Sequence, residues 1–143
     1  MFGRNNRLDV DWLANVSFFD GLERSELEQV AALAERVEAD AGAELTDQGR
    51  YGDTCYVIVQ GAANVYMNGA YVTTLSSGAM VGEMALLEHR PRVATVVAET
   101  PMVLAAFGTK AFQELLERLP KTKERVFTVL GERLRANLER RPR

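Results

Sequence analysis

The feature that most constrains the fold of this chain is a rhythm of short β-like segments punctuated by glycines. Between residues 37 and 107 strand-favouring types dominate, as in Tyr56-Val57-Ile58-Val59. Asn68-Gly69 predicts a type I′ hairpin turn, because both residue types tolerate a positive φ. Eight such segments at close intervals predict an antiparallel roll or sandwich closed on itself. The expected strands cover residues 37–40, 43–47, 54–60, 62–67, 70–75, 79–82, 92–98 and 102–107.

Helical periodicity flanks the strand region on its N-terminal side. Residues 1–7 are expected to be a flexible start, and residues 8–16 a short helix with Trp12 on its apolar side. Ser25 and Glu28 have the spacing of a capping box, in which each side chain satisfies a free amide at a helix N-terminus. A second helix is therefore expected to begin there and to end near residue 36.

A helical pattern returns after the last predicted strand. Thr109 is a suitable N-cap for a helix that Pro120 ends, and proline can also open the helix that follows. The predicted fold class is α+β, with an eight-stranded antiparallel β-roll between two groups of helices. The expected single domain over 8–143 comprises N-terminal helices at 8–36, the β-roll at 37–107 and two C-terminal helices at 109–139.

Composition narrows the classes of function. One histidine and one cysteine cannot assemble a zinc ligand set, and no nucleophile lies in a known motif with a base, so neither metal ligands nor catalytic residues are expected. A net charge of −3 argues against a nucleic-acid partner, and the late arginines alternate with acids as on a solvated helix face. No apolar run is long enough to span a membrane, and the single cysteine suits a reducing compartment. We therefore expect a cytoplasmic binding protein rather than an enzyme.

The stretch VGEMALLEHRPRVATVVA, residues 81–98, places an acid and an arginine nine residues apart. Residues 83–87 are expected to form about one helical turn, whose free amides can hold an anion. Arg92 adds a planar fork suited to a phosphate, and Gly82 lets the backbone approach a ligand closely. Glu83 would repel a phosphate but can accept from a sugar hydroxyl. These residues predict a site for one phosphate and one ribose-type hydroxyl; a Glu83–Arg92 ion pair that closes a loop explains them equally well.

The pattern G-E-M-A-L-L, closing on P-R-V-A-T-V, resembles the phosphate-binding cassette of cyclic nucleotide-binding domains. GRYGDTCYVIVQGAANVY resembles the third and fourth strands of that family, and LANVSFFDGLERSELEQVA its N-terminal helical element. Residues 120–137 are similar to its closing helix, so the resemblance covers about residues 12–138. It implies a jelly-roll type of β-roll with a short cassette helix, and it favours the phosphate-and-ribose interpretation over the loop-closing ion pair.

The resemblance also implies which residues bind the nucleotide. The implied contacts are Gly82 and Glu83 with the ribose; Arg92 and the amides of Ala85 and Val93 with the cyclic phosphate; Val65, Thr73 and Leu75 with the purine; and Arg133 and Leu134 as a lid. The expected ligand is cAMP, or cGMP, with no other cofactor. The family often has a hydroxyl at the position of Val93 that helps bind guanine. Because a lost hydrogen bond of this type costs on the order of 1 kcal/mol, we expect a modest preference for cAMP.

The expected function is that of a sensor, standing alone or excised from a larger protein. It would couple ligand binding to movement of its C-terminal helix and act on an effector protein that the sequence does not identify. The leucine stripe of that helix, Leu130, Leu134 and Leu138, serves either as the inner face of the lid or as the seam of a weak homodimer. A monomer is equally compatible with the sequence.

Three alternatives remain open at this point. A degenerate roll that only binds proteins is disfavoured by the intact Glu83 and Arg92, and a double-stranded β-helix enzyme by the lone histidine. The sequence does not exclude the same fold binding another effector, such as a cyclic dinucleotide.

Overall fold

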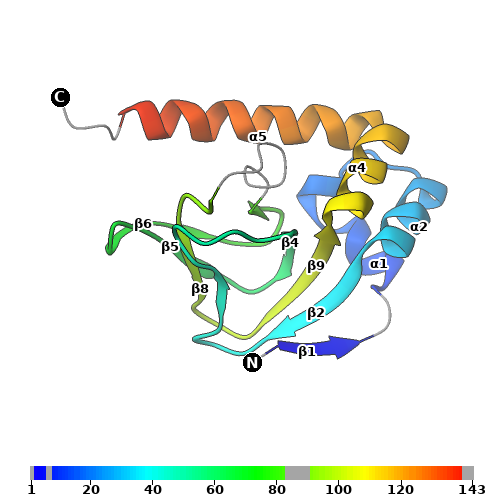
Figure 1. The fold of residues 1–143 in the computed structure, drawn as a ribbon. Coiled ribbons are helices and arrows are strands. Elements are labelled where there is room, and N and C mark those ends of the chain that lie inside the picture. The colour runs from blue at the N-terminus through cyan, green and yellow to red at the C-terminus, as the bar shows by residue number, and fades with distance from the viewer. Residues whose placement is uncertain (1, 6–7, 83–90, 140–143) are drawn as a thin grey trace.

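The computed structural model describes residues 2–5, 8–82 and 91–139, and it has a β-roll with helices on one side (Figure 1). The five-stranded sheet has the order β1-β2-β9-β4-β7, and the four-stranded sheet the order β3-β8-β5-β6. Neighbouring strands in both sheets are antiparallel. The antiparallel roll predicted from the sequence is thereby confirmed.

Each of the eight predicted strands has a counterpart in the structure. They are β2 (Glu35–Ala39), β3 (Glu44–Thr46), β4 (Thr54–Gln60), β5 (Ala63–Met67), β6 (Ala70–Leu75), β7 (Met80–Val81), β8 (Thr95–Ala98) and β9 (Met102–Gly108). The hairpin between β5 and β6 has positive φ at both Asn68 (52°) and Gly69 (79°), as a type I′ turn requires. Strand β8 begins at Thr95 rather than at residue 92, because the backbone of Arg92 instead bonds to the loop at Gly49 and Arg50.

The predicted flexible start is wrong for residues 2–5. Strand β1 (Phe2–Asn5) pairs with β2, from Phe2 opposite Ala39 to Asn5 opposite Arg36. The other side of β2 pairs with β9, so without β1 it would leave a row of unpaired amides and carbonyls at a sheet edge. Strand β1 is too short to be recognised from the sequence alone, and the free edge of β2 explains why it forms.

The helices lie where the periodicity predicted them, with small changes at their ends. They are α1 (Val10–Ala14), the 3₁₀ helix η1 (Ser17–Phe19), α2 (Arg24–Leu33), α4 (Thr109–Arg118) and α5 (Pro120–Glu139). The capping box predicted at Ser25 and Glu28 is wrong: Glu23 is the N-cap of α2, and its amide donates to the Glu26 carboxylate at 2.9 Å. The N-cap of α4 is Gly108 rather than Thr109.

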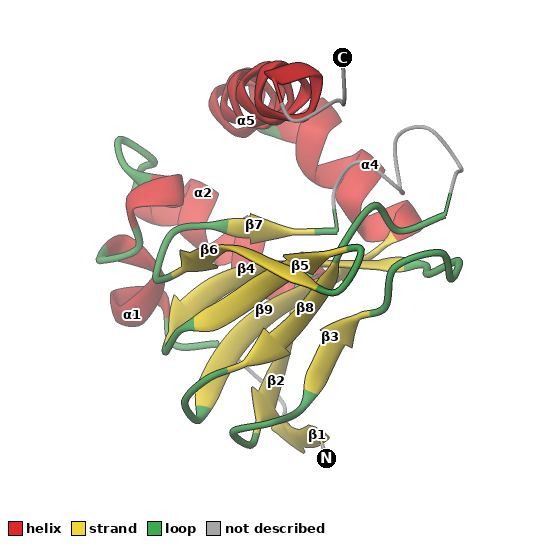
Figure 2. Ribbon diagram, turned by 90° about the vertical axis from the view of Figure 1, so that its left-hand side faces the viewer, coloured by secondary structure: helices red, strands yellow, loops and turns green. Residues whose placement is uncertain are grey.

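Two apolar clusters define the layers of the molecule. One lies between the helices and the outer face of the five-stranded sheet, and the other lies between the two sheets, in the interior of the roll. Strand β4 serves both, because its side chains alternate: Cys55 and Val57 face the helices, and Tyr56 and Ile58 face the interior. Figure 2 shows α5 nearly end-on above the strands, with α1 and α2 to one side.

Trp12 is an exception to the predicted apolar packing. Its neighbour Leu13 is fully buried, whereas Trp12 is 39% exposed, with the guanidinium of Arg36 lying 5.0 Å from the centre of its ring. The contact is a cation–π interaction at the surface, so Trp12 packs against the guanidinium of Arg36 rather than joining the core.

Candidate functional site

Arg92 is the one charged residue among the described residues that is buried, with only 7% exposed. Its Nη1 donates to the carbonyl of Gly82 at 2.8 Å, and its Nη2 donates to the carbonyl of Thr54 at 2.5 Å. A guanidinium carries five N–H donors, and within the described residues the other three have no acceptor. The buried cation is therefore held in place by backbone, and the described residues leave three of its N–H donors unused.

Two glycines make the burial of Arg92 possible. A Cβ at Gly52 would lie 2.4 Å from Nη2 of Arg92, and one at Gly82 would lie 2.3 Å from Nη1. Gly82 also has a φ of +87°, which side-chain-bearing residues rarely adopt. The guanidinium thus rests against bare backbone on two sides. The sequence predicted a close approach at Gly82 but gave no role to Gly52.

The loop after β3 fixes the backbone of Arg92. The amide of Arg92 donates to the carbonyl of Arg50, and the amide of Gly49 donates to the carbonyl of Arg92, both at 2.8 Å. Val93 follows as a half-buried residue without a hydroxyl. Glu83 and Ala85, predicted to bind the ribose and the phosphate, lie outside the described residues, and with them the predicted cassette helix.

The three residues predicted to line the purine pocket lie together on the β5–β6 hairpin. Val65 is directly opposite Thr73, and Ala63 is opposite Leu75, so all three predicted residues belong to the interior face. Val65 and Leu75 pack against the interior cluster, while Thr73 is exposed. The hairpin thereby offers two apolar side chains and one hydroxyl on a single surface.

Arg133 connects the last helix to the strand that leads to Gly82. It lies on α5 and donates through Nη2 to the carbonyl of Met80 in β7, two residues before Gly82. The predicted lid residue therefore contacts the edge of the site through the backbone of β7. The side chain of Leu134, the other predicted lid residue, lies outside the described part of the structure.

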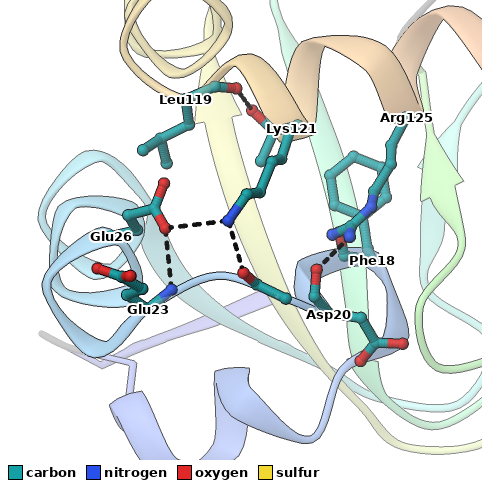
Figure 3. Close-up of polar contacts among 9 residues, drawn as sticks. Phe18, Asp20, Glu23, Glu26, Leu119, Lys121 and Arg125 are labelled. Carbon is teal, nitrogen blue, oxygen red and sulfur yellow. Dashed lines mark hydrogen bonds and ion pairs between the residues drawn. The ribbon is translucent and has the colours of Figure 1, made fainter.

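A second set of contacts holds the first turns of α5 against the N-terminal helical segment (Figure 3). Nζ of Lys121 donates to the carbonyl of Gly21 at 2.8 Å and lies 3.7 Å from the Glu26 carboxylate. Arg125 donates to the carbonyl of Phe18 at 2.5 Å and to that of Asp20. Sequence reasoning missed these residues; the only signal is two cations spaced four apart on a predicted helix, a pattern that is also common on solvated faces.

Tyr56 is a further residue of the site region that sequence reasoning did not single out as a candidate. It faces the roll interior from β4 and is opposite Val81, the residue before Gly82. Burial raises the pKa of the Tyr56 hydroxyl above 10.0, although the nearby positive charge of Arg92 acts to lower it. The hydroxyl therefore keeps its proton at neutral pH.

These features define a class of protein: a helix-flanked β-roll with a buried, backbone-held arginine beside an apolar hairpin. Such an arrangement suits a small ligand that has one anionic group and one flat apolar group. Within the described ranges, no three histidine, cysteine, aspartate or glutamate side chains converge as a metal site would require. No helix in those ranges has both the length and the apolarity needed to cross a membrane.

The chain belongs to the cyclic nucleotide-binding domain family, whose sequence profile matches residues 36–119. It is 35% identical over 122 residues to the cAMP-dependent protein kinase type II regulatory subunit of Drosophila melanogaster, a match that covers 85% of this chain and 32% of that protein. The chain thus spans about a third of that relative. The resemblance stated from the sequence is thereby confirmed.

Solved structures agree with this assignment. The Thermus thermophilus catabolite activator protein superposes with a TM-score of 0.75 at 28% identity, covering 85% of this chain and 60% of the other. The regulatory domain of Toxoplasma gondii protein kinase A, crystallised with cAMP, superposes with a TM-score of 0.73 at 26% identity, covering 86% and 48%.

Proposed function

We propose that this chain is a regulatory module that binds a cyclic nucleotide, cAMP in preference to cGMP, and has no catalytic activity of its own. The observation that carries the proposal is Arg92, buried in a backbone cradle with three N–H groups unused by the described residues. Burying a cation that has no carboxylate partner among the described residues is costly, and an anionic ligand offsets that cost. Family membership supports a cyclic nucleotide as that anion.

Each part of the nucleotide has a matching surface. Arg92 takes the cyclic phosphate together with the amides of Ala85 and Val93, and Gly82 and Glu83 take the ribose. Val65, Thr73 and Leu75 take the purine, and Arg133 and Leu134 approach from α5. Val93 supports the preference for cAMP, because its side chain cannot donate to guanine.

The output of the module is a change in α5. Arg133 bonds to the strand that leads to Gly82, so movement of that strand on ligand binding alters the position of the helix. A ligand shifts such an equilibrium only by its difference in affinity for the two positions of the helix. The partner that senses α5 is an effector protein, consistent with the similarity to kinase regulatory subunits. We expect the protein to act in the cytoplasm, as a monomer or a weak homodimer through α5, without nucleic-acid or membrane partners.

Thermal unfolding with cAMP, with cGMP and in buffer alone tests the proposal. A ligand at a hundred times its Kd stabilises the fold by about 2.7 kcal/mol, which gives a clear rise in Tm. We expect a rise with cAMP, a smaller one with cGMP at the same concentration, and none in Arg92→Leu. Because this substitution also removes two buried hydrogen bonds, Arg92→Lys is measured beside it, and Arg118→Leu on the surface of α4 serves as the control.

Two outcomes would contradict the proposal. If neither nucleotide at millimolar concentration raises the Tm of the wild type, the roll does not work as a cyclic nucleotide site, and a protein-binding role becomes the better interpretation. If a cyclic dinucleotide displaces cAMP and raises the Tm more, the fold is right but the ligand is a different one.

A further inference from the structure

Tyr56 and Arg92 share one corner of the roll interior. Thr54 and Tyr56 are two residues apart on β4 and therefore point to the same face, and the carbonyl of Thr54 accepts from Nη2 of Arg92. On the neighbouring strand, Val81 is opposite Tyr56, and the carbonyl of Gly82 accepts from Nη1. The two carbonyls that hold the guanidinium thus lie together beside the Tyr56–Val81 pair, toward the N-terminal end of β4.

The hydroxyl of Tyr56 is a hydrogen-bond donor without a partner in the described residues. The contrast with Tyr71 on β6 is informative, because the hydroxyl of Tyr71 lies 2.7 Å from that of Thr74, which in turn donates to Asn64. Tyr56 is half-buried, so its hydroxyl has lost part of its water without gaining an acceptor from the described residues. A half-buried donor of this kind is satisfied when a ligand oxygen reaches it.

The hydroxyl of Tyr56 is a neutral donor near a cation. Burial raises its pKa, the positive charge of Arg92 acts to lower it and the negative charge of Asp53 acts to raise it, so the group stays protonated at physiological pH. The guanidinium does not stack on the ring, since among the described residues the one cation–π contact is that of Arg36 with Trp12. What Tyr56 contributes to this corner is therefore its O–H.

We propose that Tyr56 is a further ligand-binding residue, whose hydroxyl donates a hydrogen bond to an exocyclic phosphate oxygen of the nucleotide held by Arg92. This inference rests on the proposed function. A charged and a neutral donor on the two exocyclic oxygens fix the orientation of the cyclic phosphate. The neutral donor does so without the desolvation cost of a second buried cation.

The first test is titration calorimetry of cAMP with the wild type, Tyr56→Phe and Tyr71→Phe. Loss of one hydrogen bond of about 1 kcal/mol weakens binding about 5-fold, and this is the effect expected for Tyr56→Phe. Tyr71→Phe removes a hydroxyl from the outer face of the same roll and is expected to bind cAMP like the wild type. Phenylalanine keeps the shape of the ring, so both variants are expected to fold.

The second test uses the two phosphorothioate diastereomers of cAMP, in each of which sulfur replaces one exocyclic oxygen. Sulfur is the poorer acceptor, so Tyr56→Phe is expected to lose its 5-fold effect with one diastereomer and to keep it with the other. Two results overturn the inference: Tyr56→Phe binding cAMP as tightly as the wild type, or an equal loss with cAMP and both diastereomers, which indicates a packing effect. Absence of cAMP binding by the wild type is a separate result, which overturns the proposed function as well.

Discussion

Arg92 is buried because its neighbours are backbone rather than side chain. Gly52 and Gly82 leave room for the guanidinium, and the carbonyls of Thr54 and Gly82 accept its hydrogen bonds. The sequence identified Arg92 and Gly82, because their spacing forms a motif. It did not identify Gly52 or Tyr56, because Gly52 approaches Arg92, and Tyr56 its backbone acceptors, only after β4 has paired with β7 and β9.

At the residue scale, we predict that Gly52→Ala displaces Arg92. The added methyl group would lie 2.4 Å from Nη2, and overpacking of this kind costs about 1–3 kcal/mol of stability. We expect a lower midpoint in urea unfolding and weaker binding of cAMP. Gly131→Ala in α5, where a Cβ meets nothing within 4 Å, is the matched control and should stabilise by about 0.5–1 kcal/mol. If Gly52→Ala has the stability and the cAMP affinity of the wild type, Gly52 is not needed to make room for Arg92.

At the scale of elements, the sequence predicted those that have a strong local signal. Alternation and glycines located the eight strands of the roll, and helical spacing located α4 and α5. The sequence did not predict the contact between α5 and η1, because Arg125 and Phe18 are 107 positions apart. A cation on a helix gives the same sequence pattern when its side chain faces water as when it bonds to backbone carbonyls.

The contact between α5 and η1 leads to an asymmetric prediction for its two cations. Arg125 is partly buried and bonds to two carbonyls, and hydrogen bonds to charged groups contribute about 1.5–3 kcal/mol. Lys121 is exposed, and surface contacts of its kind contribute about 0–1 kcal/mol. Urea unfolding should therefore show a large loss of stability for Arg125→Ala and a small one for Lys121→Ala. Equal losses of stability in the two variants would mean that the partial burial of Arg125 does not add to its contribution.

At the scale of the whole molecule, the described helices contact β7 and the turn before it at two places. Arg133 bonds directly to β7, and Arg125 holds η1, in which Ser17 packs closely against Gly78 just before β7. Gly78 has a φ of +93°, and a Cβ there would lie 2.1 Å from Oγ of Ser17. In the proposed coupling, a shift of β7 acts on α5 through both of these contacts.

Hydrogen exchange along α5, with and without saturating cAMP, tests this coupling. We expect cAMP to change amide protection in α5 of the wild type, and we expect that change to shrink in Arg133→Gln, because its bond to Met80 is weakened. The affinity for cAMP should change in step, since coupling between two sites is reciprocal. Arg135→Gln, exposed on the same helix, is the control and should behave like the wild type. If Arg133→Gln keeps the full response, the signal reaches α5 through η1 instead, and the response should then be lost in Arg125→Ala.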